Sequence, residues 1–363
     1  MARMPDDTRR MLLACLRSAL WGEPLPASRL SDAEAEALLA EARRQSVVGM
    51  VADVLLRQGV QAEGDEALYA YADLQKIRER NRYVDGELAA FSSFLVRHGV
   101  RQAVVKGQIV ARAYPQPDVR QSGDIDFYLD AENYAAAKPL IEKQLGVELR
   151  AHASEKHVEF EGNGVHYEMH SLLADFAYPP HQRRWERLLL ADMAAGSHSV
   201  EVAGVAVPTL SPTFHALYIF CHILYHLAIS GVGLRQFCDW AAWLVRYRAE
   251  VDGGQLRSAL RELGLQRAWA ALGTVLTDAL GVPAGALHLP LTDTDHRRGA
   301  RVLRNVFRMG NFGHNVHGTG PQGLRRSLET GRIALCQSLR FLPLAPAEML
   351  LRVPRLLSWY VRR

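Results

Sequence analysis

The feature that most constrains the fold is a pair of aspartates, Asp124 and Asp126, inside a hydrophobic strand pattern. Side chains alternate between the two faces of a β-strand, so the two carboxylates share a face with Tyr128. The intervening apolar residues point to the opposite, core-facing side: Ile125, Phe127 and Leu129. A strand of this kind needs a sheet with a hydrophobic layer on one face and a polar site on the other.

Two carboxylates held this close repel each other and raise a pKa unless a cation lies between them. Oxygen ligands favour a hard divalent ion, so Mg²⁺ is expected first and Mn²⁺ second. Metals held in this way commonly serve phosphate groups. The alternative is that Asp124 and Asp126 are the solvated face of an edge strand, where charges are ordinary.

The residues before the aspartates predict a strand, a glycine turn and a short helix. Val104 and Val105 are β-branched and precede Gly107, which can bring its backbone close to a phosphate. The helix is expected over residues 108–114, because two prolines follow it. Lys106, one of only five lysines in the chain, lies at the junction as a compact positive charge.

A third carboxylate is expected from a β-hairpin centred on Gly162-Asn-Gly164. In its second strand His166, Glu168 and His170 share one face, so that Glu168 can complete a triad with the two aspartates. Two alternatives stay open: an ordinary exposed glutamate, or a dedicated His-Glu-His site for a softer transition metal.

The stretch VVKGQIVARAYPQPDVRQSGDIDFYLD resembles the uncharacterised bacterial nucleotidyltransferases of the DNA polymerase β-type superfamily. The family pattern is Lys-Gly, a Tyr-Pro turn, an arginine and Asp-hydrophobic-Asp, followed on a later strand by a third acid and a histidine. VHYEMHSLL supplies the last two as Glu168 and His170. The specific motifs cover about residues 100 to 175.

The resemblance implies roles for individual residues. The catalytic and metal-binding residues would be Asp124, Asp126 and Glu168, with two metals orienting a triphosphate and activating the acceptor hydroxyl. The nucleotide-binding residues would be Lys106, Gly107, Gln108, Arg120, Ser122 and His170. Gln108 replaces the serine usual in the wider superfamily, and the gap from Gly107 to Asp124 is longer than usual.

Arg120 precedes the aspartates on a loop, where its guanidinium could bind a phosphate through two hydrogen bonds. An ion pair with Asp118 or Asp124 is the alternative. Farther along the chain, Arg235 and Asp239 are four residues apart and predict a simple pair on one helix face.

The remaining sequence is mainly helical. Residues 1–98 predict amphipathic helices, with a capping box at Ser31 and a long helix from about Asp65 through Val96. The expected fold is α+β: a small mixed sheet forming a nucleotidyltransferase core at residues 99–210, between these N-terminal helices and a C-terminal helical domain at residues 211–363.

Three further expectations concern the chain after the hairpin. Pro179-Pro180 predicts a break, two short strands are expected around Gly204, and one helix is expected over residues 256–280.

Two groups in the C-terminal part invite other interpretations. Cys221, His222, His226 and Cys238 suggest zinc, but their spacing matches no compact zinc motif, and His222 or His226 can instead face the nucleotide cleft. The glycine-rich segment 310–321 lacks the strand-to-helix context of a P-loop and is expected to be a surface loop or a lid.

Composition sets the cellular context. Four scattered cysteines favour a reducing compartment, so the protein is expected to be cytoplasmic. No signal peptide or transmembrane segment is expected. From Arg297 onward the chain contains 13 arginines and two acids, which indicates an anion-binding surface or a solvated helix face. The basic tail at residues 342–363 either contacts an anionic membrane or nucleic acid weakly or docks as a helix on the body.

The expected activity is therefore metal-dependent transfer of a nucleoside monophosphate from an NTP, first of all ATP, to an unidentified hydroxyl or phosphate acceptor. Pyrophosphate would be released. The alternative is a non-catalytic binding module that keeps the fold, at a membrane surface or in a biosynthetic complex. Fold and metal site do not name the acceptor.

Overall fold

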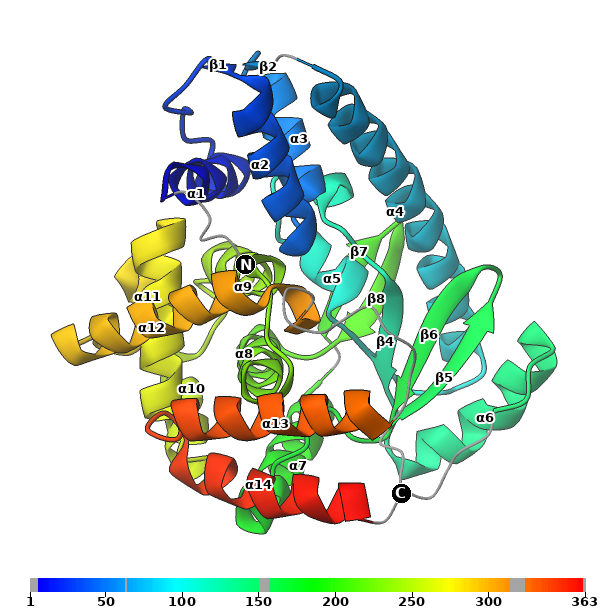
Figure 1. The fold of residues 1–363 in the computed structure, drawn as a ribbon. Helices are drawn as coiled ribbons and strands as arrows, with labels where there is room; N and C mark the ends of the chain where they lie inside the picture. The colour runs from blue at the N-terminus through cyan, green and yellow to red at the C-terminus, as the bar shows by residue number, and fades with distance from the viewer. Residues whose placement is uncertain (1–5, 63, 150–156, 197, 314–323, 362–363) are drawn as a thin grey trace.

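The computed structural model describes residues 6–62, 64–149, 157–196, 198–313 and 324–361 (Figure 1). Amphipathic helices form the N-terminal part, as the sequence predicts. Their bounds, with a short parallel strand pair, are α1 Asp6–Trp21, β1 Arg29–Leu30, α2 Asp32–Arg44, α3 Val48–Arg57, β2 Gln61–Ala62 and α4 Glu66–Arg97. The capping box at Ser31 is confirmed: Glu34 accepts hydrogen bonds from the backbone N–H and the hydroxyl of Ser31.

A four-stranded mixed sheet follows, in the order β3-β4-β6-β5. Its strands are β3 Ala103–Val105, β4 Asp124–Tyr128, β5 His157–Gly162 and β6 Val165–His170. β4 runs parallel to β6, and the outer pairs are antiparallel. The predicted hairpin is confirmed, with Asn163 and Gly164 both at positive φ, as a tight type I′ turn requires. The predicted α+β fold is thus correct.

Shorter elements connect and extend this sheet. They are α5 Gly107–Ala111, a 3₁₀ turn at Pro117–Val119, α6 Ala131–Leu145, α7 Pro179–Ala194 and the hairpin β7 His198–Val202 with β8 Val205–Thr209. The two short strands around Gly204 were expected, but α7 was not. Pro179 lies at the start of that helix, where its missing N–H costs nothing, and it does not break the chain.

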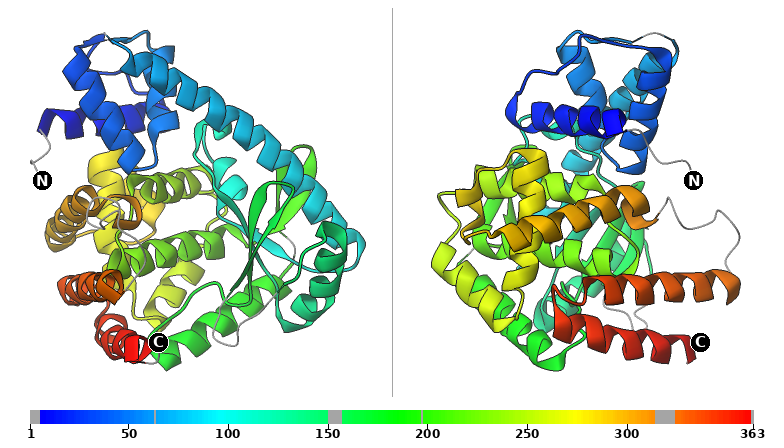
Figure 2. Two further views of the ribbon diagram at one scale, coloured as in Figure 1. Left: turned by 45° about the vertical axis from the view of Figure 1, so that its right-hand side comes forward. Right: turned by 60° about the vertical axis from the view of Figure 1, so that its left-hand side comes forward.

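The sheet lies between helices. The long helix α4 crosses one face, where Phe91 packs on Phe127 and Tyr167 with ring centroids 5.2 and 4.8 Å apart. The opposite face carries Asp126 and Glu168 and looks toward α8 and α9 (Figure 2). The apolar side chains of β4 therefore pack against α4, and its aspartates face the opposite side, where they line a cavity.

The C-terminal part is helical as predicted. Its helices are α8 Pro212–Ile229, α9 Leu234–Arg246, α10 Gly253–Glu262, α11 Gln266–Leu280, α12 Asp293–Met309, α13 Leu324–Phe341 and α14 Pro346–Val361. A single helix over 256–280 was expected. The chain instead turns at Gly264, whose φ is +64°, and this turn separates α10 from α11.

Helix α8 is the most apolar of these elements. It has the length and hydropathy of a membrane span, yet 78% of that stretch is buried inside the structure, as in a core helix. One hydrophobic core extends from Leu12 to Met349, through both helical parts and the sheet. The proposed division at residues 98 and 210 stays a prediction.

The basic tail docks on the body. In α14 the side chains of Glu348, Met349 and Arg352 are buried, while Leu350 and Leu351 are exposed. Helices α13 and α14 lie side by side in both figures, and α13 packs on α8. The docking alternative is therefore confirmed for the described part of the tail.

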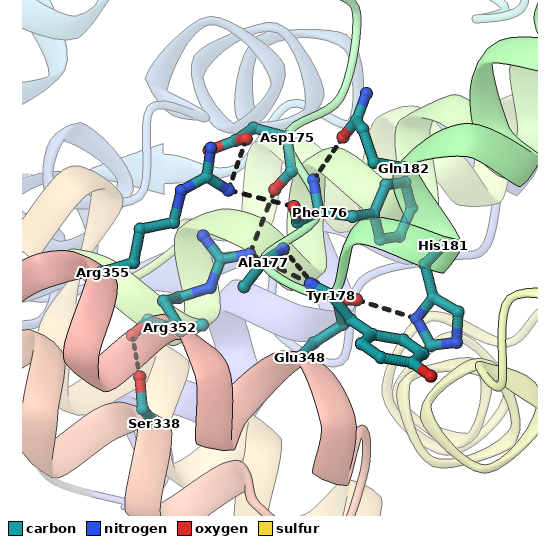
Figure 3. A network of polar contacts seen from close by, with 11 residues as sticks. Asp175, Phe176, Ala177, Tyr178, His181, Gln182, Ser338, Glu348, Arg352 and Arg355 are labelled. Atoms are coloured by element: carbon teal, nitrogen blue, oxygen red, sulfur yellow. Dashed lines mark hydrogen bonds and ion pairs between the residues drawn. The ribbon is translucent and has the colours of Figure 1, made fainter.

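Figure 3 shows how α14 is held. The buried Glu348 carboxylate accepts hydrogen bonds from the backbone N–H of Ala177 at 2.6 Å and from Nδ1 of His181 at 2.8 Å. Arg355 pairs with Asp175 at 2.9 Å. The tail is thus fixed by charge-assisted bonds to the loop that follows β6 and to His181 of α7.

Candidate active site

The three predicted acids are brought together by strand register. In the parallel pair β4 and β6, Asp126 lies directly opposite Glu168, and Asp124 lies opposite His166. Asp126 is only 2% exposed, whereas Asp124 and Glu168 are partly exposed. The expectation of a solvated edge strand is therefore wrong for Asp126.

Lys106 neutralises the central carboxylate. Its Nζ lies 2.6 Å from Oδ1 of Asp126, and its backbone is held at φ +55°, which is strained for a residue with a side chain. Burial disfavours the charged lysine, but Asp126, Tyr218, Asp124 and Glu168 outweigh burial and raise the Lys106 pKa. Lys106 is therefore a permanent cation within the site.

His170 is the second partner of Asp126. Its Nε2 lies 2.8 Å from Oδ1 of Asp126 and 3.3 Å from Glu168. Burial raises the Asp126 pKa, but Lys106 and His170 together hold it well below its usual range. Burial disfavours the charged form of His170, but its hydrogen bonds to Asp126 and Glu168 raise its pKa. Asp126 is thus ionised at neutral pH.

Asp124 behaves differently from Asp126. Burial, with the nearby negative charge of Asp126, raises the pKa of Asp124, and Lys106 only partly opposes this. The predicted repulsion between the two carboxylates therefore raises the pKa of Asp124 and not that of Asp126. A divalent cation at this end would relieve it.

The ligand atoms fit a hard cation at this point. Oxygens of Asp126 and Glu168 and a nitrogen of His170 lie within 4.8 Å of one another, as do ligand atoms of His157, Glu159 and Glu168. Both described contacts of the Asp126 carboxylate fall on Oδ1. The carboxylates of Asp126 and Glu168 supply oxygen ligands of the kind that Mg²⁺ prefers, whereas Asp124, on the same strand, belongs to neither cluster.

The transition-metal alternatives are not assembled among the described residues. His166 turns to Glu161, with Nδ1 2.9 Å from its carboxylate, and does not join Glu168 and His170. Likewise, no ligand cluster in the described part of the chain includes Cys221 or Cys238. His222 and His226 instead line the cavity, as the cleft alternative predicted.

The predicted nucleotide-binding residues divide into two groups. Gly107 and Ser122 line the cavity, and a Cβ on Gly107 would come within 3.2 Å of the Asp124 carbonyl oxygen. Gln108 points the other way, where its amide donates to Asp85 and Asn81 of α4. Its predicted nucleotide contact is therefore not supported, because its side chain packs behind the site.

Arg120 lies at the cavity wall with its guanidinium already engaged. Nε and Nη2 bind the two oxygens of Asp239 at 2.6 and 2.8 Å, and Nη1 donates to Ser122 at 3.0 Å. The Tyr114 hydroxyl also donates to Asp239, at 2.6 Å. Asp118 and Asp124 are therefore the wrong partners for Arg120. The Nε and Nη2 edge of the Arg120 guanidinium, which would bind a phosphate, is occupied by Asp239.

The predicted pair between Arg235 and Asp239 is also wrong, because Asp239 belongs to Arg120. Arg235 lines the cavity and donates from Nη1 to the Gln121 carbonyl at 2.9 Å. Sequence spacing missed this exchange. An arginine and an aspartate four residues apart predict an ion pair on one helix face, and this spacing does not reveal a distant arginine that binds the same aspartate.

The Arg120–Asp239 pair gives a first testable prediction. Asp239→Asn should lower the free energy of unfolding by about 3–5 kcal/mol, because it leaves the buried Arg120 charge uncompensated. Asp278→Asn is the matched control: its partner His296 is at the surface, so a change of about 0–1 kcal/mol is expected. Urea unfolding of both variants measures the difference, and equal losses would contradict a structural role for Asp239.

The acids open into a cavity of about 730 Å³ between the sheet, α8, α9 and α14. One wall carries Tyr218, His222 and His226 at one-turn intervals along α8, followed by Phe312, whose ring is 4.9 Å from that of His226. Burial lowers the pKa of His226 to about 3 and that of His222 well below its usual range. This wall is therefore neutral and aromatic.

Only part of the glycine-rich segment can be placed. Asn311 and Phe312 line the cavity, whereas residues 314–323 lie outside the described residues. Its role as a lid stays a prediction. Arg352, on α14, contributes to the opposite rim and lies over the Tyr225 ring at 4.9 Å.

Comparisons with known proteins identify the family of the chain. A solved structure, an antigenic nucleotidyltransferase-like protein from Paracoccidioides brasiliensis, is similar over 55% of this chain and 92% of its own, at 14% identity and a TM-score of 0.34. No curated protein matches the chain. A family model described as uncharacterised nucleotidyltransferase matches residues 31–281, which include every predicted site residue. The chain therefore belongs to this uncharacterised nucleotidyltransferase family.

Proposed function

We propose that this protein transfers a nucleoside monophosphate from an NTP, with ATP as the first candidate, to a hydroxyl or phosphate acceptor. The observation that carries the proposal is the position of Asp126 opposite Glu168, with Asp124 on the same strand, at the base of a large cavity. Membership in a nucleotidyltransferase family supports the same reaction class.

The reaction needs positioning and charge stabilisation. The acceptor oxygen would attack the α-phosphorus, the bond from that phosphorus to the bridging oxygen of the β-phosphate would break, and pyrophosphate would leave. The acceptor proton would pass to solvent. Charge develops on the phosphoryl oxygens, so fixed cations beside them lower the barrier.

Asp124, Asp126 and Glu168 would hold Mg²⁺ or Mn²⁺. When bound, the metal would neutralise phosphate charge and make an acceptor hydroxyl easier to deprotonate. His170 orients Asp126 through its 2.8 Å contact, and Lys106 keeps that carboxylate ionised. The aromatic wall on α8 would exclude water from the cavity.

A binding module without catalysis is the second candidate, and one observation favours it. Lys106 and His170 already compensate Asp126 within the protein, so its fold does not require a metal. Such a module could act at a membrane surface or in a biosynthetic complex in the cytoplasm. Both candidates bind a nucleotide, and only the first turns it over.

Incubation with each of the four labelled NTPs tests the proposal. With Mg²⁺ or Mn²⁺ we expect pyrophosphate release and a labelled product, and with EDTA neither. A matched control is the Asp124→Asn variant under the same conditions. Metal-dependent binding of an NTP without pyrophosphate release, across a broad set of acceptors, would favour the binding module.

A further inference from the structure

Two arginines reach the cavity from different elements, and they differ in how their charge is compensated. Arg120 is buried and binds both oxygens of Asp239. Arg235, in the first turn of α9, makes no ion pair with any described residue and donates from Nη1 to a carbonyl oxygen. The positive charge of Arg235 is therefore not neutralised by a carboxylate in contact with it.

The surroundings of Arg235 make this costly. Its Nε is buried and has no hydrogen-bond partner among the described residues. A partly buried guanidinium without a counter-ion loses hydration that the protein does not fully replace, and an acceptor group on a ligand would satisfy its remaining N–H groups. The unpaired charge lines the same cavity as the acids.

Geometry places Arg235 at the start of the strand that carries Asp124: its Nη1 donates to the carbonyl of Gln121, three residues before Asp124, and both side chains line the cavity. Burial and the neighbouring Arg120 lower the pKa of Arg235, and Asp239 and Asp124 oppose this without restoring it. Arg235 therefore lies near the beginning of β4, whereas Lys106 pairs with Asp126 farther along that strand.

We propose that Arg235 binds a phosphate group of the nucleotide and forms, next to Asp124, a polyphosphate subsite of the cavity. This inference rests on the proposed function. Arg120 cannot bind a phosphate in this way, because Asp239 already accepts hydrogen bonds from its Nε and Nη2. Lys106 is already paired with Asp126. A guanidinium with unused N–H groups matches phosphate oxygens in both charge and geometry.

The probe is inorganic pyrophosphate with Mg²⁺, measured by calorimetry beside ATP and adenosine. Arg235→Gln should weaken binding of pyrophosphate and ATP by roughly 10-fold or more, the scale of a lost charge-assisted hydrogen bond. Binding of adenosine, which has no phosphate, should not change. Arg235→Lys should recover part of the loss, and Arg246→Gln, at the exposed end of the same helix, should bind like the wild type.

Pyrophosphate and ATP should also compete, and pyrophosphate should raise the melting temperature of the unmodified protein. This second measurement tests the phosphate subsite, and Arg235→Lys tests the residue, even if the glutamine variant does not fold. Unchanged pyrophosphate affinity in Arg235→Gln, or no stabilisation of the wild type by pyrophosphate, overturns the proposal. Simultaneous binding of ATP and pyrophosphate overturns it too, because the anion site would then serve the acceptor.

The outcome is separable from that of the proposed reaction. If pyrophosphate binding depends on Arg235 but no NTP is turned over, the reaction is wrong and the phosphate site stands. If NTPs are turned over and Arg235→Gln binds them normally, the reaction stands and this site is wrong.

Discussion

Asp124→Asn and Asp126→Asn should both abolish metal-dependent NTP binding, yet differ in their effect on stability. Each removes one of the carboxylates that would hold the cation, so the gain in nucleotide affinity from Mg²⁺ should disappear. Turnover should fall by roughly 10²-fold or more in both variants.

The stability difference follows from the surroundings of the two aspartates. Asp126 is the direct counter-ion of Lys106, so its loss should cost about 2–3 kcal/mol, less than a fully isolated charge because Asp124 and Glu168 remain nearby. Asp124 has a raised pKa and makes no described ion pair, so its neutral variant should be as stable as the wild type.

Calorimetry with Mg²⁺ and with EDTA, beside melting curves, measures both effects. The two variants are matched because they change the same group on the same strand. Equal nucleotide affinity in Mg²⁺ and in EDTA for the wild type would contradict the metal-binding role of the acids.

Glu168→Gln should separate binding from chemistry. In the superfamily that the sequence resembles, the third acid chiefly serves activation of the acceptor hydroxyl. The structure places Glu168 beside Asp126, partly exposed to the cavity, with His170 3.3 Å away. We expect near-normal binding of the NTP with Mg²⁺ and a turnover reduced by roughly 10²-fold or more.

The measurement is product formation at saturating NTP together with a melting curve. Glu161→Gln, an exposed change in the same hairpin, serves as the control and should retain full turnover. Unchanged turnover in Glu168→Gln, or a loss matched by unfolding, would remove Glu168 from the catalytic residues. A binding module would show no turnover in any variant.

Local patterns predicted much of the fold. The period of two in β4 and β6 correctly separated the acids that line the cavity from Phe127 and Tyr167, which pack against α4, because side chains alternate between the two faces of a strand. The hairpin turn at Asn163 and Gly164 and the long helix α4 were equally legible. These features depend on residues that are neighbours in sequence.

The interpretation of Pro179 and of the 256–280 segment failed for a related reason. A proline often ends a helix, yet it is also favourable at the first position of a helix. Only the structure of the residues that follow it shows which of these applies. The turn at Gly264 separates two helices whose apolar patterns can also be read as one continuous helix. Packing against other elements decided both.

The sequence by itself placed Asp124 and Asp126 on one strand face and Lys106 at the end of another strand, and the resemblance to the nucleotidyltransferases added Glu168 as a third acid. Tertiary structure alone decided which charges are paired. Asp239 is 119 residues from Arg120, and the contact between them leaves Arg235 without a carboxylate partner among the described residues. A buried charge without a partner is strongly destabilising, so burial determines which ion pairs must form. The packing of the helices on the sheet determines which side chains are buried together.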